Sequence, residues 1–378
     1  MAELGALEAG VLPAGVRARF VDGVNGLRMH VLEAGWEGEG RPGLLLLHGF
    51  PELAYSWRKQ LPALAAAGFH VVAPDQRGYG RTTGWSADYD AELAPFSMLN
   101  VTRDAVALVA ALGWRSVAGV IGHDFGASVA AGCALIRPDL FRSVAIMSAP
   151  FSGPPSIRPK PAPQGPSIHQ ALAALPRPRK HYQHYYATPQ ANADMWRAPQ
   201  GMQAFLRAYF HHKSADWTAN RPFRLAGWTA EELAKMPTYY VMDWADDMAA
   251  TVAKEAPSAA ETAACRWLTE AELRVYAGEY ERNGFQGALQ WYRCRTLAEP
   301  NAALNLFSGR TIDVPSLFIA GRSDWGIHQV PGAIEAMQER ACTDLRGCHL
   351  LDGAGHWVQQ EQPEKVNALL LEFLRQAG

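Results

Sequence analysis

The first 150 residues alternate between short, continuously apolar segments and longer segments with helical periodicity. Strands are expected at residues 27–32, 44–47, 71–73, 117–121 and 144–147. Helices are expected at residues 53–67, 99–112 and 127–136. Strands that are apolar at every position are typical of a sheet covered on both faces. The alternation therefore predicts a mostly parallel sheet with helices on both sides.

The pattern changes abruptly after residue 150. Seven of the seventeen residues from Pro150 to Pro166 are proline, and each proline removes a backbone donor and fixes φ, so this segment is a predicted stiff linker. From about residue 167 to residue 300 the periodicity is helical, and no strand is predicted. Thr269 begins one well-marked helix with a capping box, and Gly284 ends it.

Strand patterns return near the C-terminus, at residues 316–320 and 349–351, and helices are expected after them at residues 332–341 and 363–375. The α/β pattern thus resumes after a helical insertion. We predict one interrupted sheet domain, doubly wound and mostly parallel, with a helical cap inserted between two of its strands. The core is expected at residues 1–150 and 301–378, with the linker and the cap at residues 151–300.

Composition narrows the class of protein. Apolar residues make up 48 % and charged residues 19 %, which argues against disorder, and the net charge of −2 argues against general attraction to nucleic acid. No apolar run approaches the roughly 20 residues that cross a bilayer, and the N-terminal residues lack the pattern of a secretory signal. Five scattered cysteines suggest no disulfide framework. We expect a reduced, cytoplasmic protein without membrane insertion.

A strand–turn–helix motif carries the first candidate chemistry. Gly122-His123-Asp124-Phe125-Gly126 lies between the expected strand at 117–121 and the helix at 127–136. Flanking glycines allow a sharp turn that projects one side chain above a sheet, as in a nucleophile elbow. The usual serine is replaced by Asp124. The alternative, an aspartate that caps the following helix, stays open on this motif alone.

Two further residues complete a triad in the order that such a sheet requires. Asp324 follows the expected strand at 316–320, and His356 follows the strand at 349–351. Each lies in a loop after the carboxyl end of a late strand, where an acid and a base would meet Asp124. Three members in order are a much stronger indication of catalysis than any one of them.

A glycine-containing turn, His48-Gly49-Phe50-Pro51-Glu52, directly follows the strand at 44–47. Its geometry can direct the backbone N–H of Phe50 toward the site, beside the N–H of Phe125. Two such donors form an oxyanion hole. A simple strand-ending turn is the alternative.

Together these motifs resemble the epoxide hydrolases of the α/β-hydrolase fold, from about residue 16 to the C-terminus. Two cap segments resemble the same family, residues 181–186 (HYQHYY) and 275–293 (VYAGEYERNGFQGALQWYR). The resemblance implies that Tyr182 and Tyr276 face the nucleophile. It also implies that Glu52 and His123 hydrogen-bond the hydrolytic water. Spacing alone does not separate Tyr276 from Tyr280, which shares its helix face.

An aspartate nucleophile suits substrates that are opened by displacement at a saturated carbon, because the ester that it forms can be hydrolysed, whereas a serine would form an ether. Epoxides and alkyl halides both fit. An alkoxide leaving group needs a proton, which phenols can supply. Haloalkane dehalogenases commonly have Trp after the nucleophile and Asn near the His-Gly turn, where this chain has Phe125 and Phe50. Epoxide hydrolysis is therefore the predicted reaction; a dehalogenase and a non-catalytic binding protein are the alternatives.

The remaining candidates concern the pocket and the assembly. Trp291 and Tyr186 are candidates for the substrate pocket, although packing of the cap onto the core is favoured for Trp291. No carboxylate–histidine pattern predicts a metal site, and no cofactor is expected. The expected partner is a small-molecule epoxide; a homodimer stays open. Which epoxide is used, and what residues 229–266 do, is not predicted.

Overall fold

The computed structural model describes residues 4–157, 165–297 and 299–378. An eight-stranded sheet with the order β1-β2-β4-β3-β5-β6-β9-β10 forms its centre. The strands are β1 (Val16–Val24), β2 (Leu27–Ala34), β3 (Gly43–Leu47), β4 (His70–Pro74), β5 (Gly119–His123), β6 (Val144–Met147), β9 (Ser316–Gly321) and β10 (Leu345–Leu351). The pairs β1/β2 and β2/β4 are antiparallel and the other neighbours are parallel. The predicted mostly parallel α/β-hydrolase sheet is confirmed.

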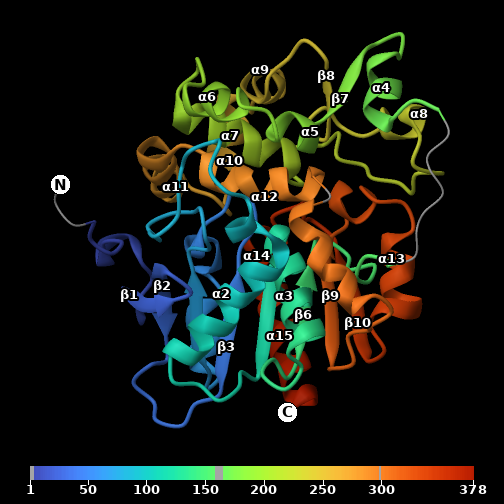
Figure 1. Cartoon of the computed structure of the whole chain (residues 1–378). Coiled ribbons are helices and arrows are strands. Elements are labelled where there is room, and N and C mark those ends of the chain that lie inside the picture. Colours follow the sequence, from blue (N-terminus) through green and yellow to red (C-terminus); the bar gives the residue numbers. More distant parts are fainter. Residues whose placement is uncertain (1–3, 158–164, 298) are drawn as a thin grey trace.

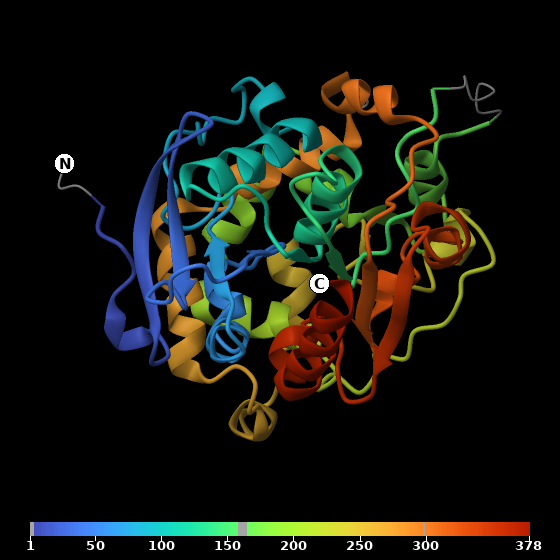
Figure 2. The ribbon, with the colours of Figure 1, turned by 90° about the horizontal axis from the view of Figure 1, so that it is seen from below.

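Helices cover both faces of this sheet. They are α1 (Leu61–Ala66), α2 (Met98–Ala111), α3 (Phe125–Ile136), α13 (Ala333–Ala336), α14 (Val358–Glu361) and α15 (Pro363–Ala377). Seen from below, α2 and α3 lie on one side of the strands while α1 and α15 lie on the other (Figure 2). Every residue of β3, β5, β6 and β9 is therefore buried, which explains why these sequences are apolar apart from His123 at the end of β5 and Ser316 at the start of β9.

A helical cap lies above the carboxyl ends of the parallel strands (Figure 1). It contains α4 (Ile168–Ala173), α5 (Tyr182–Tyr186), α6 (Ala191–Trp196), α7 (Met202–Lys213), α8 (Ala230–Leu233), α9 (Met248–Ala253), α10 (Ala259–Ala264), α11 (Glu270–Asn283) and α12 (Gln286–Thr296). Thr269 and Gly284 cap α11 as predicted, and Gly284 has a φ of 63°. Residues 158–164 of the predicted linker lie outside the described residues. The domain boundaries stay a prediction.

Three expectations about local structure need correction. The cap does contain strands, β7 (Arg179–His181) and β8 (Val241–Asp243), which pair antiparallel but are too short to show a periodicity. The expected helix at 53–67 is a 3₁₀ turn, Ala54–Trp57, followed by the short α1. Strand β1 was not predicted, because charged residues (Arg17, Arg19 and Asp22) interrupt its apolar positions, so it lacks the continuously apolar pattern of the central strands. Among the helices of the described residues, none has the length and apolar character to cross a membrane.

Candidate active site

The turn between β5 and α3 projects Asp124 above the sheet. Asp124 has a φ of 54°, a left-handed conformation that non-glycine residues rarely adopt. Glycines on both sides permit the turn: a Cβ on Gly122 would lie 2.1 Å from the carbonyl oxygen of Gly126, and one on Gly126 would lie 2.1 Å from that of Leu47. The Asp124 side chain makes no hydrogen bond that caps α3. The helix-cap interpretation is therefore wrong, and the turn has the geometry of a nucleophile elbow.

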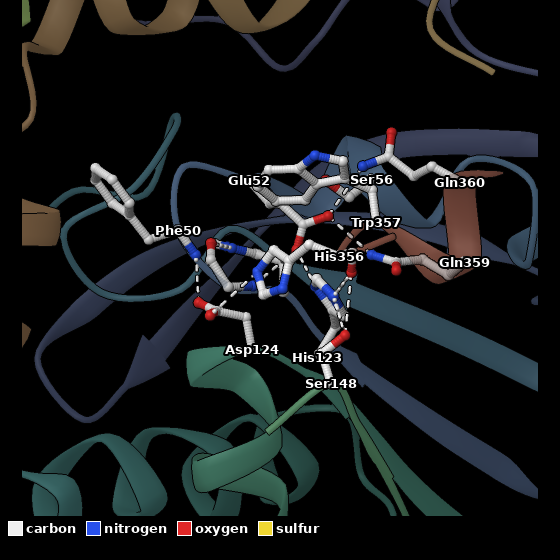
Figure 3. Close-up of polar contacts among 12 residues, drawn as sticks. Phe50, Glu52, Ser56, His123, Asp124, Ser148, His356, Trp357, Gln359 and Gln360 are labelled. Carbon is white, nitrogen blue, oxygen red and sulfur yellow. Dashed lines mark hydrogen bonds and ion pairs between the residues drawn. The ribbon is translucent and has the colours of Figure 1, made fainter. Parts of the chain in front are cut away.

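Asp124, His356 and Asp324 lie in one line of contacts. The Nε2 atom of His356 is 3.4 Å from Oδ2 of Asp124, and its Nδ1 is 3.1 Å from Oδ1 of Asp324 (Figure 3 shows the first pair). His356 and Asp324 are almost completely buried, whereas 17 % of the Asp124 side chain is exposed. Asp324 also accepts a hydrogen bond of 2.7 Å from the backbone N–H of Gly326. The three predicted triad members are brought together, with the outermost one open to a cavity.

Both carboxyl groups are held in the ionised form. Burial would raise the pKa of Asp124, but the hydrogen bond and charge of His356, with the charge of Lys213, outweigh it and lower the pKa well below its usual range. Burial would likewise raise the pKa of Asp324, but the charge and the hydrogen bond of His356 outweigh burial and lower this pKa. Asp124 is thus a carboxylate at neutral pH, as a nucleophile must be.

One of the two predicted backbone donors, the N–H of Phe50, contacts Asp124. The N–H of Phe50 donates a hydrogen bond of 3.0 Å to Oδ1 of Asp124 (Figure 3), and the Phe50–Pro51 peptide bond is cis. Phe125 is the first residue of α3, so its N–H has no partner within the helix. Oδ1 is therefore the oxygen held by the backbone, and Oδ2 is the oxygen that faces His356.

Tyr182 shares a cavity with Asp124. This cavity has a volume of about 60 Å³ and is lined by both residues together with Tyr292 and Gln329. The Tyr182 hydroxyl accepts hydrogen bonds of 3.1 Å from the side-chain amides of Gln183 and Gln329, which leaves its own proton to be donated elsewhere. Burial and the charge of Asp124 raise its pKa to about 12, so the phenol is protonated at neutral pH.

The predicted second tyrosine, Tyr276, lies elsewhere. It is completely buried, and its hydroxyl is 2.9 Å from Oγ of Ser56 and donates a hydrogen bond of 3.2 Å to Oε1 of Gln360. It does not line the cavity of Asp124. Helix α11 turns this residue toward a polar cluster that satisfies its hydroxyl, so the expectation that Tyr276 faces the nucleophile does not describe this structure. Tyr280, on the same helix face, is 3.5 Å from the Glu52 carbonyl oxygen.

Comparison with known proteins agrees with this geometry. A family profile described as alpha/beta hydrolase fold matches residues 42–363. The chain is 36 % identical to epoxide hydrolase A of Mycobacterium tuberculosis over 94 % of this chain and 96 % of that protein. It is 32 % identical to an epoxide hydrolase of Caballeronia sordidicola, over 93 % and 92 % of the two chains. The solved epoxide hydrolase of an endophytic Streptomyces superposes with a TM-score of 0.73 at 33 % identity, over 96 % of both chains.

This chain belongs to the epoxide hydrolase family. The relatives cover almost its full length, so the match includes the cap as well as the sheet. The family assignment made from the motifs is confirmed, and the chain is a hydrolase of the α/β-hydrolase fold. The roles of individual residues rest on the geometry described here.

Glu52 and His123 form a completely buried pair beneath the predicted triad. Nδ1 of His123 is 2.6 Å from Oε2 of Glu52, and its Nε2 donates a hydrogen bond of 2.7 Å to the His356 carbonyl oxygen. Burial would raise the pKa of Glu52, but the charge of His123 outweighs it and lowers this pKa. Burial would lower the pKa of His123, but the charge of Glu52 outweighs it and raises this pKa. Since both ring nitrogens face acceptors, the pair is a carboxylate and an imidazolium.

The oxygens of Glu52 are fully occupied. Oε2 also accepts from the backbone N–H of Gly49 at 3.2 Å, and Oε1 accepts from the side chains of Gln359 at 2.8 Å and Gln360 at 3.0 Å (Figure 3). Four hydrogen bonds use all the acceptor sites of a carboxylate. In this arrangement the pair ties the turn of Phe50 to the loop of His356. A role for Glu52 and His123 in holding the hydrolytic water stays a prediction.

The two pocket candidates differ in position. Trp291 lines a cavity of about 360 Å³ that adjoins the Asp124 cavity, and its indole N–H donates a hydrogen bond of 2.9 Å to the Arg77 carbonyl oxygen. Trp291 thus packs the cap onto the core and also borders the larger cavity. Tyr186 is completely buried, donates a hydrogen bond of 3.1 Å to the Tyr209 hydroxyl, and lines neither cavity.

Sequence reasoning missed a buried cation at the end of α7. The Nζ atom of Lys213 lies 4.9 to 5.7 Å from the ring centres of Tyr209, Tyr239, Tyr240 and Trp357. Burial lowers its pKa, against the charges of Asp124 and Asp324. Its carbonyl oxygen accepts a hydrogen bond of 2.9 Å from the N–H of His356. No motif marks this lysine, because three separate segments supply the rings around it.

Glu361 was missed as well. It lies in α14, and its carboxyl group accepts hydrogen bonds from the N–H groups of Gly355 and Trp357, both at 2.9 Å, and of Ala215 at 2.8 Å. Gly355 and Trp357 flank His356. Glu361 therefore holds the histidine loop from both sides and joins it to the cap.

Proposed function

We propose that this protein hydrolyses an epoxide to a vicinal diol through a covalent ester on Asp124. The observation that carries the proposal is the environment of the two Asp124 oxygens. Oδ1 accepts a hydrogen bond from the Phe50 N–H, while Oδ2 lies 3.4 Å from Nε2 of His356 and borders a cavity. A carboxylate so placed can attack a carbon and can then be regenerated by a base on the other side.

In the first step, Oδ2 of Asp124 forms a bond to an epoxide carbon as the carbon–oxygen bond of the ring breaks. The ring oxygen takes the proton of Tyr182, and a phenolate remains. A phenol suits this role because it stays protonated at neutral pH yet is more acidic than the alcohol that it creates. The two amide N–H groups on the Tyr182 oxygen stabilise the phenolate.

In the second step, Nε2 of His356 accepts a proton from water, and the resulting hydroxide attacks the ester carbonyl carbon of Asp124. Asp324 stabilises the imidazolium through Nδ1. The developing charge on Oδ1 is held by the N–H of Phe50 and of Phe125. The ester bond to the diol oxygen then breaks, that oxygen takes the proton from His356, and the proton left on the acid returns through His356 to Tyr182.

Isotope labelling tests the covalent step. In a single turnover in oxygen-18 water, we expect the first diol to carry no label and Asp124 to acquire it, because the diol oxygen comes from the carboxylate. His356→Gln should accumulate the ester, visible as a mass increase on the peptide that contains Asp124. Label in the diol of the first turnover would refute the proposal, since it would mean direct attack by water.

Two variants test which of the predicted tyrosines donates a proton to the ring oxygen. Tyr182→Phe should lower kcat for epoxide opening by about 10²- to 10⁴-fold. Tyr276→Phe should match that loss only if its hydroxyl leaves Gln360 to reach the substrate during turnover. A small effect of Tyr276→Phe excludes Tyr276 and leaves Tyr292, which lines the Asp124 cavity beside Tyr182, as the second phenol to test.

Two expectations go beyond the reaction. A cytoplasmic location and a homodimer both stay predictions. Fractionation of cells that produce the protein at native level tests the location, and light scattering of the purified protein tests the assembly.

A further inference from the structure

Two cavities meet beside the candidate nucleophile. The cavity that contains Asp124 measures about 60 Å³, which accommodates a reacting group and little more. The adjoining cavity measures about 360 Å³, within the range of small-molecule pockets, roughly 300–1,000 Å³. Both are lined by Phe125, Ser128, Ala149, Pro150 and Arg295. A substituent on an epoxide bound at Asp124 therefore extends into the larger cavity past these five residues.

The larger cavity is apolar with one charged side chain. Its walls include Phe96, Phe125, Phe151 and Trp291, and among its described lining residues Arg295 alone carries a formal charge. An aromatic wall suits an apolar substituent. The guanidinium at the junction of the two cavities does not help to bind an apolar substituent, because a neutral group gains nothing from a nearby charge.

Arg295 has no anionic partner in the described part of the protein. It lies in the last turn of α12, is exposed, and stands over the Phe125 ring with Cζ 5.6 Å from the ring centre. It also lines the small cavity together with Tyr182. Neighbouring Arg293 differs, since it donates to the Tyr89 carbonyl and to Gln290 and stacks 3.7 Å from the Tyr89 ring centre.

We propose that Arg295 binds a carboxylate of the substrate, so that the protein prefers epoxides that carry an acid group. The epoxide lies at Asp124, the carboxylate pairs with Arg295, and any apolar portion occupies the larger cavity. The planar guanidinium offers paired donors that match a carboxylate. This inference rests on the proposed epoxide hydrolysis and names its substrate class.

The alternative role of Arg295 is structural. A cation in the last turn of a helix interacts favourably with the helix dipole, without any ligand. Arg293 occupies the same last turn but lies away from the cavities, so it is the matched control. Arg295→Gln and Arg293→Gln remove one charge each from this helix end.

The test compares terminal epoxides that end in a carboxylate with the corresponding primary amides, which are neutral and of equal size. We measure kcat/KM for 3,4-epoxybutanoate, 5,6-epoxyhexanoate and 9,10-epoxydecanoate and for their amides. The wild type should prefer the acid at one or more chain lengths. Arg295→Gln should lower the acid-to-amide ratio by about 5- to 50-fold through KM, whereas Arg293→Gln should not. Arg295→Lys should restore part of the ratio, and added salt should reduce it.

The outcomes separate this inference from the proposed function. Turnover of the amides with an acid-to-amide ratio near one at every length overturns the inference and leaves epoxide hydrolysis intact. An Arg295→Gln variant that loses thermal stability while its ratio stays that of the wild type also overturns the inference, in favour of the structural role. Turnover of neither acids nor amides overturns the proposed function and this inference with it.

Discussion

The buried pair beneath the triad is directly testable by Glu52→Gln. The carboxylate of Glu52 accepts four hydrogen bonds, two on each oxygen, from His123, Gly49, Gln359 and Gln360. Glutamine offers one oxygen and one NH₂ group in the same volume. Whichever way the new amide is turned, two of the four donors face another donor instead of an acceptor.

The magnitude follows from these contacts. Each buried donor left without an acceptor costs about 1–3 kcal/mol, and removing one partner of a buried ion pair costs about 3–5 kcal/mol. Gln359 can relieve part of the conflict by rotating its amide, because its Oε1 has no partner among the described residues. We therefore expect Glu52→Gln to lower the free energy of unfolding by about 3 kcal/mol. We also expect kcat to fall, because His123 holds the carbonyl group of His356.

The assay is a double-mutant cycle with His123→Gln, measured by urea unfolding. If the pair is ionised, the losses of unfolding free energy in the two single variants should add up to more than the loss in the double variant. The difference, which is the coupling energy, should be about 2 kcal/mol. The pH dependence has a defined sign. The lowered pKa of Glu52 means that its contribution is complete above about pH 4.5 and is lost as the pH falls through the folded value. The raised pKa of His123 means that its contribution is complete below about pH 6.5 and is lost on raising the pH.

The coupling should therefore be largest between about pH 4.5 and 6.5. A coupling below about 0.5 kcal/mol throughout this window would refute the reasoning, because it would mean that the two groups face each other without opposite charges. A coupling that grows as the pH rises above 8 would contradict the assigned protonation of His123.

Three further predictions concern residues around the triad. Asp124→Asn should lower kcat/KM by about 10⁴-fold or more, measured as diol formation, while the protein stays folded by circular dichroism. Lys213→Met should raise the pKa of Asp124 because it removes a buried cation, so the acidic limb of the kcat/KM–pH profile should lie at higher pH than in the wild type. A parallel loss at all pH values would contradict this. Glu361→Ala leaves the N–H groups on both sides of His356 without their acceptor and should lower the unfolding free energy by about 2–4 kcal/mol. It should also lower kcat, and a loss of stability with kcat retained would show that the loop keeps its position without Glu361.

Much of the sheet was predictable because its central strands are short runs of apolar residues separated by helices. Strands β3 and β6 lie within a residue of their predicted limits, since burial on both faces leaves a continuous apolar pattern. Strand β1 was not predictable in this way, because it lies at the edge of the sheet beside β2 alone and its charged residues interrupt the apolar pattern. The three-residue strands β7 and β8 form only by pairing with each other, and each is too short to show a pattern in the sequence.

The candidate site divides in the same manner. Asp124, Asp324 and His356 could be recognised because each follows a strand, and the carboxyl ends of parallel strands meet at one edge of the sheet. No comparable rule predicts which side chains of the cap helices face the site. Tyr182 lies in the cavity of Asp124, whereas the Tyr276 hydroxyl is turned to Ser56 and Gln360, a choice that the helix period of α11 does not decide.

The amino-acid sequence by itself therefore determined the fold class and the epoxide hydrolase family, and it predicted the three residues of the candidate triad, because these depend on local patterns and on the order of strands in one sheet. Only the tertiary structure decided what surrounds them. Lys213 is enclosed by rings from α7, from the segment before β8 and from the His356 loop, and Arg295 lies where a cap helix meets two cavities of the core. Such environments arise when distant segments pack together, and no local pattern in the chain records which segments will meet.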